Sequence, residues 1–440
     1  MTTKEKAIQI FKAAVAAVQP DQLLPSHLFI ENHTLHILGQ RFFVNGLHNI
    51  YLLGAGKASA AMAKTVEDIL GNLITAGIVV TKYGHALPLQ KIVCIEAAHP
   101  VPDEQGVAAT TKTIQLLQQA DENDIIICLI SGGASSLWID IPEGASLADV
   151  QETFQLLLKS GATIYEVNTI RKHLSALKGG QLLRWAPRSS WFSFIISDVP
   201  GDELSVIASG PTVPDTSTFA DVKAILEKYG LTDQLPAAIL KHVDDGIKGI
   251  INETLKAEDP VFRQAHNKII GSNTIALEAA AEKAAQLGFH IPFIENSLNG
   301  DAATVGRELI LQCKKYRGIL PACFLLGGET TVRVKGNGKG GRNQHMALSA
   351  QLELVAGNVK DIPNEITFLS AGTDGTDGPT DAAGAIADRH TLSRAHEKNL
   401  DAGKFLNDND SYHFFEQTGG LVKTGATQTN VMDLVVVIIE

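Results

Sequence analysis

Four glycine-rich segments of this chain carry residues that could bind a phosphorylated ligand. GAGKAS (54–59) and SGGASS (131–136) lie in the first half, whereas GNGKGGRNQ (336–344) and GTDGTDG (372–378) lie in the second. Glycine lets backbone N–H groups approach an oxyanion closely, and a helix that begins at such a turn adds the positive end of its dipole. We therefore expect one anion-binding cleft to which both halves of the chain contribute.

Two cations in these segments are the main candidates for catalysis. Lys57 and Arg342 each stand at a glycine-rich turn that directly precedes a predicted helix. A cation at the positive end of a helix is unfavourable unless an anion lies nearby. The planar guanidinium group of Arg342 also matches the geometry of a carboxylate or a phosphate. We predict that both side chains contact the reacting groups of anionic substrates.

Glycines and serines of the same segments are the predicted contacts to a nucleotide cofactor. GAGKAS matches neither the Walker loop nor the dinucleotide GxGxxG pattern, because Tyr51 and Ser59 stand where glycine is required. A purely structural turn is therefore the alternative for GAGKAS, and helix capping is the alternative for each serine of SGGASS. The predicted contacts are Gly54, Gly56, Ser59, Ser131, Gly132, Gly133, Ser135, Gly338, Gly340 and Gly341.

Acidic residues that follow predicted strands are candidates for base catalysis and metal binding. Asp198 comes shortly after a strand predicted at 192–196, in a loop rich in proline and glycine, and we predict that it is the general base or a metal ligand. A solvated turn aspartate is the alternative. Asp374 and Asp377 lack EF-hand spacing, but with Glu329 they could hold Mg²⁺ together with phosphate oxygens. An ordinary Asp-Gly turn is the alternative for Asp377.

A basic segment at 168–180, NTIRKHLSALKGG, is predicted to be a helix that ends at two glycines. Lys178 is expected to be structural, because a cation is favourable near the C-terminal end of a helix. His173 has no second ligand at helical spacing and is expected to be a half-buried histidine with satisfied hydrogen bonds. Arg171 is a further candidate for binding a substrate carboxylate.

The elements that must position these residues alternate along the chain. Short apolar runs, such as 50–53 and 125–130, alternate with longer amphipathic patterns, such as 103–119. This alternation predicts an α/β fold with mainly parallel sheets in Rossmann-like layers. A polar stretch at 244–259 is the best boundary, so the predicted domains are 1–260 and 261–440. In open α/β sheets, ligands bind at the carboxyl ends of the strands, which is where GAGKAS and SGGASS fall.

Composition excludes several classes of protein. The chain has 440 residues, 45% hydrophobic residues and a formal net charge of −11, which argues against nucleic acid as a partner. No signal sequence or apolar run long enough for a membrane span is present, so we expect a cytoplasmic protein without a membrane partner. The four cysteines form no CxxC pair and are expected to be reduced thiols.

Taken together and in order, the motifs resemble those of the glycerate 2-kinase family of glycerate kinases. That family has an N-terminal glycerate kinase domain and a C-terminal MOFRL domain. The matching segments are GAGKAS, HPVPDE (99–104), SGGASS, NTIRKHLSALKGG, SDVPGDELSVIASGPTVPD (197–215), GGETTV (327–332), GKGGRNQ (338–344) and TDGTDGPTDAAGA (373–385).

The resemblance implies ATP-dependent and Mg²⁺-requiring phosphorylation of D-glycerate at its 2-hydroxyl group. It also implies two α/β domains that flank a deep cleft. The functional lysine and arginine of the family fall on Lys57 and Arg342, and the aspartate of the SDVPGD loop falls on Asp198. The expected partners are therefore the small molecules D-glycerate and ATP, whereas formation of a homodimer stays open.

The chain departs from the family pattern in several places, and two other functions remain as alternatives. Departures include Ala134 in SGGASS, His345 after GGRNQ, and Ala426, Gln428 and Met432, where proline, glycine and asparagine are usual. One alternative is a hydroxypyruvate reductase, although the chain lacks a nicotinamide fingerprint. The other is a protein that binds a nucleotide or a carboxylate without catalysis.

Overall fold

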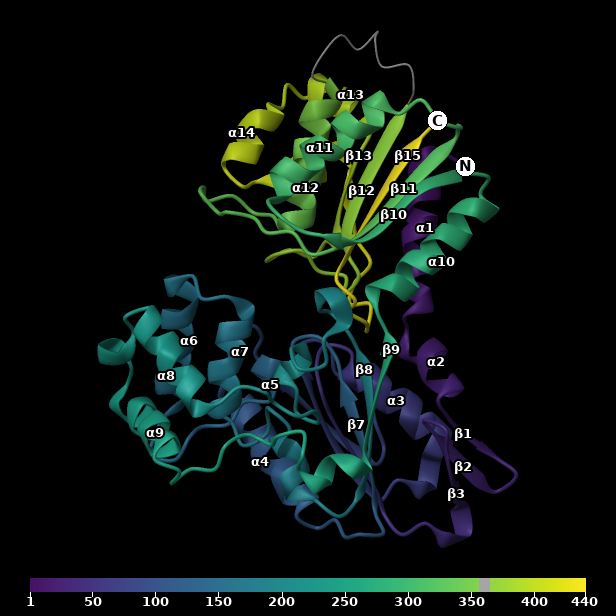
Figure 1. Ribbon diagram of the computed structural model, residues 1–440. Coiled ribbons are helices and arrows are strands. Elements are labelled where there is room, and N and C mark those ends of the chain that lie inside the picture. Colours follow the sequence, from purple (N-terminus) through teal and green to yellow (C-terminus); the bar gives the residue numbers. More distant parts are fainter. Residues whose placement is uncertain (356–364) are drawn as a thin grey trace. The chain divides into compact units, whose positions relative to one another are not determined.

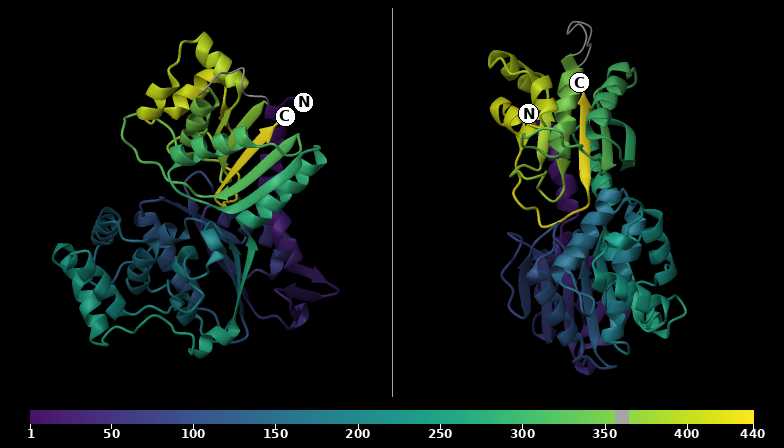
Figure 2. Two further views of the ribbon diagram at one scale, coloured as in Figure 1. Left: turned by 45° about the horizontal axis from the view of Figure 1, so that its top comes forward. Right: turned by 90° about the vertical axis from the view of Figure 1, so that its left-hand side faces the viewer.

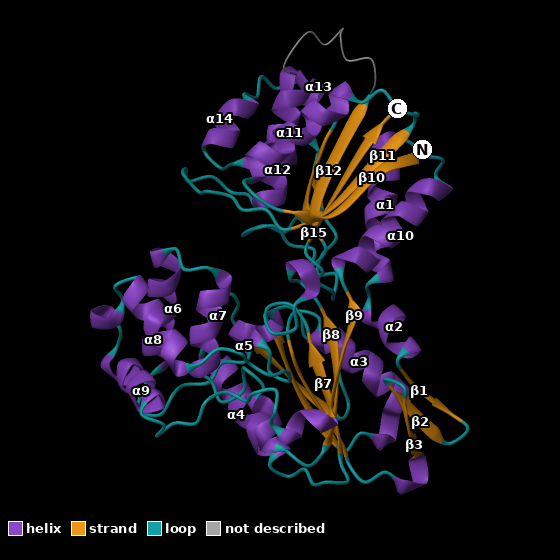
Figure 3. Ribbon diagram, in the orientation of Figure 1, coloured by secondary structure: helices purple, strands orange, loops and turns teal. Residues whose placement is uncertain are grey.

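The chain forms two compact units. Figure 1 shows the computed structural model, which describes residues 1–355 and 365–440. One unit comprises Leu23–Ile270 and is called the N-terminal unit. The other comprises Met1–Gln22 and Gly271–Glu440 and is called the C-terminal unit. Each unit contains a sheet with helices packed against it, as Figure 3 shows.

The sheet of the N-terminal unit has six strands: β4 Ile50–Ala55, β5 Ala76–Lys82, β6 Ile92–Ala97, β7 Ile125–Ile130, β8 Ser190–Ile196 and β9 Ala265–Gly271. Their order is β6-β5-β4-β7-β8-β9, and the pairs from β6 to β8 are parallel. Strands β4 and β7 are buried at every position, as expected for central parallel strands that are covered on both faces.

The strand order of this sheet reverses at β4. The chain first adds β5 and β6 on one side of β4 and then returns to add β7 and β8 on the other side. Such a reversal is the topological switch point at which α/β sheets bind ligands, outside the carboxyl ends of the strands. The register places Ala55 of β4 beside Ile130 of β7, and Ile130 beside Ile195 of β8. The loops that follow these three strands therefore begin at one edge of the sheet.

The helices of the N-terminal unit form two groups. Helices α3 and α4 contact the sheet, whereas α6 to α9 pack with one another around an apolar core of their own. Helices α6, α7 and α8 begin with capping boxes at Ser146, Thr163 and Thr218, which explains where each of them starts. The bounds are α3 Ser59–Leu70, α4 Glu104–Leu117, α5 Ala134–Leu137, α6 Leu147–Ser160, α7 Ile164–His173, α8 Phe219–Lys228 and α9 Ala237–Ile247.

Two smaller features precede the large sheet. Helix α2 spans Pro20–Leu23, and an antiparallel three-stranded sheet follows it. The strands of this small sheet are β1 Leu28–Glu31, β2 Thr34–Ile37 and β3 Gln40–Phe43.

The sheet of the C-terminal unit is mixed. Its strands are β10 His290–Leu298, β11 Ala322–Gly328, β12 Ile366–Gly372, β13 Gly384–Ala387, β14 Leu421–Val422 and β15 Asp433–Ile439, in the order β10-β11-β15-β12-β13-β14. The pair β10–β11 is parallel, and the other four described pairs are antiparallel. The predicted α/β class is confirmed, but the parallel character holds mainly for the first sheet. An apolar run does not reveal strand direction, and β15 enters between β11 and β12 in the opposite direction.

Helices cover both faces of this second sheet, as the right-hand view of Figure 2 shows. Helices α1 and α10 pack together on one face, whereas α11 and α12 share a core with Val435, Val437 and Ile439 of β15 on the other. The bounds are α1 Thr3–Ala17, α10 Asn273–Gln286, α11 Ala302–Lys315, α12 Arg342–Val355, α13 Arg389–Glu397, α14 Ala402–Asn407 and α15 Ser411–Thr418.

The two units differ from the predicted division at residue 260. Strand β9, which lies after residue 260, still belongs to the N-terminal sheet, and that unit ends at Ile270. Helix α1 belongs to the C-terminal unit. The reason for the second difference is the buried face of α1, including Ile10 and Phe11, which is covered by α10 and by strands β12 and β15. The amphipathic pattern of α1 predicts that it must pack, but not against which sheet.

Two further expectations concern the whole chain. All four cysteines are free thiols, as predicted: Cys94, Cys128, Cys313 and Cys323. Among the helices of residues 1–355 and 365–440, none has the length and apolar character needed to cross a membrane.

Candidate active site

The loop that carries Lys57 is held against the SGGASS loop. The backbone N–H of Lys57 donates to the carbonyl oxygen of Gly132 at 2.9 Å, and the N–H of Ala58 donates to Ser131 Oγ at 3.0 Å. Gly56 has a φ of +131°, and a Cβ atom there would lie 2.2 Å from Ser131 Oγ. Only glycine allows this close approach. The first two glycine-rich segments therefore form one composite turn at the switch point of the N-terminal sheet.

Some of the predicted cofactor contacts have structural partners in this turn. Ser59 is buried, and its Oγ lies 2.8 Å from the carbonyl oxygens of both Gly56 and Val80. A Cβ atom at Gly54 would lie 2.6 Å from the carbonyl oxygen of Leu129, so this glycine is needed for close strand packing. These positions shape the turn, and their contact with a nucleotide stays a prediction.

His99 reaches this turn from the loop after β6. A Cβ atom at Gly133 would lie 2.9 Å from the His99 ring and 3.7 Å from Cγ of Lys57. The absence of a side chain at Gly133 thus leaves room for both neighbours. His99 belongs to the HPVPDE motif, but the motif by itself predicts no role for it. Its position shortly after the short run 92–97, which forms β6, is the signal that could have identified it.

The loop after β8 carries Asp198 and reaches the SGGASS segment. Asp198 is half-buried and lies two residues beyond the end of β8. Further along the same loop, Ala208 and Ser209 adopt positive φ values of 53° and 58°. Ser209 Oγ lies 3.1 Å from Ser135 Oγ, so the two loops are in contact. Strained backbone of this kind is often retained at functional sites.

The basic segment at 168–180 is largely structural. Lys172 forms a buried ion pair with Asp215, with an Nζ–Oδ1 distance of 3.1 Å. The two ring nitrogens of His173 lie 2.8 Å from the Thr169 carbonyl oxygen and 3.0 Å from Glu253, which confirms the expectation of satisfied hydrogen bonds. His173 is buried, however, and not half-buried as predicted. Lys178 donates to a backbone carbonyl at 2.5 Å, and burial lowers its pKa to about 8. The helix predicted over 168–180 was wrong in its extent, because α7 ends at His173 and Lys178 lies beyond it. The structural role of Lys178 stays a prediction.

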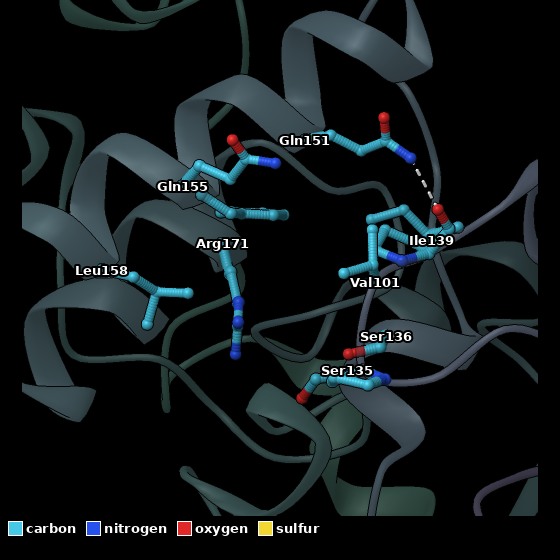
Figure 4. Close-up of a pocket in the computed structure, with 11 residues that line it drawn as sticks. Val101, Ser135, Ser136, Ile139, Gln151, Gln155, Leu158 and Arg171 are labelled. Carbon is cyan, nitrogen blue, oxygen red and sulfur yellow. Dashed lines mark hydrogen bonds between the residues drawn. The ribbon is translucent and has the colours of Figure 1, made fainter. Parts of the chain in front are cut away.

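Arg171 of this segment lines a pocket together with Ser135 and Ser136. Figure 4 shows its side chain extending from α7 toward the hydroxyl groups of Ser135 and Ser136. The guanidinium carbon lies 5.0 Å from the centre of the Phe154 ring. Burial lowers the pKa of Arg171. The pocket lies entirely within the N-terminal unit.

In the C-terminal unit, two carboxylates hold the guanidinium group of Arg342. Its Nε and Nη2 atoms donate to Asp433 at 2.5 and 2.9 Å, and its Nη1 atom lies 2.6 Å from Glu329. Burial disfavours the charge on Arg342, but the attraction of Asp433 and Glu329 outweighs this effect and raises its pKa. The side chain of Arg342 remains 32% exposed, whereas that of Asp433 is 2% exposed. The arginine is thus held firmly by two carboxylates and remains partly exposed.

Asp433 is a partner of Arg342 that the motifs do not single out. It is the first residue of β15 and pairs with Gly328 of β11 and Gly372 of β12, so it lies at the sheet edge where the GGET and GTDG turns begin. The signal that could have found it is a carboxylate at the end of TGATQTNVMD, directly before an apolar run.

Asp377 caps α12 and does not fit a metal ligand. Its two carboxylate oxygens accept the backbone N–H groups of Asn343 and Gln344 at 3.1 and 2.8 Å. A Cβ atom at Gly341 would lie 2.2 Å from Asp377 Oδ1, so this glycine allows the cap to form. Burial raises the pKa of Asp377 to about 7.

The other two predicted metal ligands are also engaged. Glu329 pairs with Arg342, and Asp374 Oδ1 accepts the backbone N–H of Thr376 at 3.0 Å. Within residues 1–355 and 365–440, no group of three or more histidine, cysteine, aspartate or glutamate side chains could hold a metal ion. The predicted contact to Mg²⁺ is one shared with phosphate oxygens, so it stays a prediction.

The GNGKGG loop is fastened to an acidic turn at 408–410. Backbone N–H groups of Lys335, Asn337 and Lys339 donate to side chains of this turn at 2.7, 3.1 and 2.9 Å. Cβ atoms at Gly338 and Gly340 would lie 2.4 Å from Asp410 and 2.2 Å from Ser411. These donors are used within the protein, so the structure supports a packing role for the two glycines, and their nucleotide contact stays a prediction.

Comparison with known proteins extends over both units. The family described as a domain of unknown function, DUF4147, matches residues 6–244, and the MOFRL family matches residues 322–433. Glycerate 2-kinase of Pyrococcus horikoshii is 40% identical over 445 residues, which cover 100% of this chain and 98% of that protein. D-glycerate 2-kinase of Thermotoga maritima is 40% identical and covers 98% of this chain and 97% of its own.

A solved structure agrees with these matches. The crystal structure of a glycerate kinase from Thermotoga maritima has a TM-score of 0.83 and 38% sequence identity, and the match covers 99% of both chains.

Proposed function

This chain belongs to the glycerate 2-kinase family, and we propose that it transfers the γ-phosphoryl group of ATP to the 2-hydroxyl group of D-glycerate. The observation that carries the proposal is the convergence of three loops at the switch point of the N-terminal sheet. These loops hold Lys57, the SGGASS segment and Asp198 at the edge where α/β sheets bind ligands. The full-length match to glycerate 2-kinases supports the same reaction.

The proposed mechanism relies on charge neutralisation and positioning, as phosphoryl transfer generally does. Lys57 and Arg342 neutralise negative charge on the anionic substrates. The 2-hydroxyl oxygen of glycerate attacks the γ-phosphorus, and the bond to the oxygen that bridges the β- and γ-phosphates breaks. ADP leaves, and Asp198 accepts the hydroxyl proton. No covalent intermediate with the protein is required.

We propose that Mg²⁺ enters as the complex with ATP, where it neutralises phosphate charge. Asp374 is retained as the proposed carboxylate contact to this ion. Asp377 caps α12 through both of its oxygens, and Glu329 pairs with Arg342, so neither is assigned to the metal.

The deciding experiment identifies the product. The chain is incubated with ATP, Mg²⁺ and D-glycerate, and phosphorus NMR distinguishes 2-phosphoglycerate from 3-phosphoglycerate. We expect only the 2-isomer, and a 3-phosphate product would overturn the regiochemistry. A parallel incubation with hydroxypyruvate and NADH tests for reduction, and oxidation of NADH would revive the reductase alternative.

A further inference from the structure

The pocket around Arg171 combines an apolar wall with a few polar groups. Loop residues after β6, together with α5, α6 and α7, surround it, and Val101, Ile139 and Leu158 supply apolar surface. Small-molecule sites commonly have this composition, in which a few polar groups fix the orientation of the ligand. Gln151 is already engaged, because its side chain donates to the carbonyl oxygen of Pro102 at 2.7 Å.

Arg171 supplies a positive charge to this pocket. No carboxylate among residues 1–355 and 365–440 forms an ion pair with it. Its described neighbours are the Phe154 ring and the like-charged Lys178, whose pKa it helps to lower. Arg342 and Arg188, by contrast, each contact two carboxylates. Removing a guanidinium group from water without a matching anion is costly. The contact with the Phe154 ring uses none of the N–H donors of Arg171, so these donors can bind an anionic ligand.

Ser135 supplies a hydrogen-bond acceptor to the same pocket. Ser209 Oγ donates its single proton to Asn168 Oδ1 at 3.0 Å. The contact of 3.1 Å between Ser135 Oγ and Ser209 Oγ must then use the proton of Ser135. Ser135 therefore presents lone pairs to the pocket, and these pair with a hydroxyl group of a ligand rather than with an anion.

We propose that this pocket binds the phosphoryl acceptor, with the carboxylate of glycerate on Arg171 and one of its hydroxyl groups on Ser135. The inference rests on the proposed function, and it deepens that function by naming the residues that select a hydroxy acid. A donor for a carboxylate and an acceptor for a hydroxyl occur together in one cavity, which is the pattern that a 2-hydroxy acid requires. Arg171 takes the carboxylate in this arrangement, so Lys57 is not needed for it.

The first test is the variant Arg171→Met, which keeps much of the apolar stem and removes the charge. KM is measured separately for D-glycerate and for ATP, and thermal unfolding reports on folding. We expect KM for D-glycerate to rise by about 10- to 100-fold, because a charge-assisted interaction is lost. KM for ATP and the unfolding temperature should change little. Arg188→Met is the matched control, since its side chain is 71% exposed on the same unit, and it should behave like the wild type.

Three outcomes distinguish a failure of the pocket assignment from a failure of the proposed function. An unchanged KM for D-glycerate in Arg171→Met, with the wild type active, overturns the inference but not the proposed function. A rise confined to KM for ATP also overturns it and assigns the pocket to the nucleotide. If the wild type does not phosphorylate glycerate at all, the proposed function itself fails.

The variant Ser135→Ala tests how glycerate is oriented in the pocket. Ligand binding is measured directly, so the test does not depend on catalysis. Isothermal titration of the wild type, Arg171→Met and Ser135→Ala with D-glycerate and with propionate, which keeps the carboxylate but lacks hydroxyl groups, separates the two contacts. We expect Arg171→Met to weaken both ligands and Ser135→Ala to weaken only D-glycerate. Equal binding of D-glycerate by all three proteins would contradict the assignment.

Discussion

Arg342 and Asp433 form a bidentate ion pair where the central strand β15 of the C-terminal sheet begins. Both carboxylate oxygens of Asp433 accept hydrogen bonds from the guanidinium group. The two residues are 91 positions apart in the sequence. Asp433 is fixed at the start of β15 between β11 and β12, so it determines where the arginine lies. A residue that no motif singled out therefore positions one of the two predicted catalytic cations.

Replacing Asp433 by asparagine should reduce both turnover and stability. The buried partner of Arg342 would lose its charge, and we expect a loss of about 3 kcal/mol in the free energy of unfolding. Denaturant titration measures this value, and a coupled assay of ADP release measures kcat. Glu329→Gln is the control for stability, because Glu329 is 43% exposed and its ion pair should contribute only about 0–1 kcal/mol. An equal loss in the free energy of unfolding for the two substitutions would contradict the larger contribution assigned to the buried carboxylate of Asp433.

Lys57→Ala should abolish most of the activity without unfolding the chain. Loss of a cation that stabilises the transferred phosphoryl group should lower kcat at least about 100-fold. Lys64→Ala is the control, since Lys64 lies in α3 close to Lys57 and pairs with Asp68 at the surface. Circular dichroism should show the same helical content for both variants. A near-normal rate for Lys57→Ala would remove this residue from the mechanism.

The stability of the chain should contain a component that decreases as the pH rises toward 7. The pKa of Asp377 is raised to about 7 by burial, whereas an unfolded aspartate titrates near 3.9. Between these values the folded chain binds more protons than the unfolded chain, so this component is complete below about pH 4 and is lost as the pH rises through about 7. Asp377→Asn cannot titrate, and its free energy of unfolding should vary less over this range. Identical pH profiles for the two proteins would show that Asp377 does not titrate in this way.

The acidic turn at 408–410 should control the order of the GNGKGG loop. Asp410 Oδ1 accepts the backbone N–H of Lys339 at 2.9 Å, so Asp410→Ala should speed hydrogen exchange at this amide by about tenfold. Mass spectrometry of peptides that cover 335–341 provides the measurement. Glu416→Ala, at an exposed position of α15, should leave the exchange unchanged. Unchanged protection in Asp410→Ala would mean that other contacts hold the loop.

Gln428→Gly should stabilise the chain. Gln428 has a φ of +63°, and its buried Oε1 has no hydrogen-bond partner among the described residues. Glycine removes both penalties, and after its greater chain entropy is subtracted the expected gain is about 1 kcal/mol. Gln417→Gly, the same substitution within α15, should have the opposite effect because glycine disfavours a helix. Thermal unfolding compares them, and a lower melting temperature for Gln428→Gly would contradict the strain argument.

The positions of the first-sheet strands and of the loops that follow them could be predicted from local patterns. The predicted strand at 125–130 coincides with β7, and the one at 50–53 lies within β4. Apolar periodicity and glycine-rich turns are properties of neighbouring residues, so they are readable from the sequence. For the same reason the local pattern alone is enough to place Lys57 and Asp198 after the ends of strands.

Local patterns therefore establish the α/β class and the family and predict the segments in which the chemistry lies, whereas the folded chain settles which of these residues meet. Folding pairs Arg342 with Asp433, turns Asp377 into a helix cap, and opens the pocket beside Arg171. These contacts depend on strand order and direction, which are set by how apolar faces far apart in the chain are buried against one another, and no local pattern records that choice.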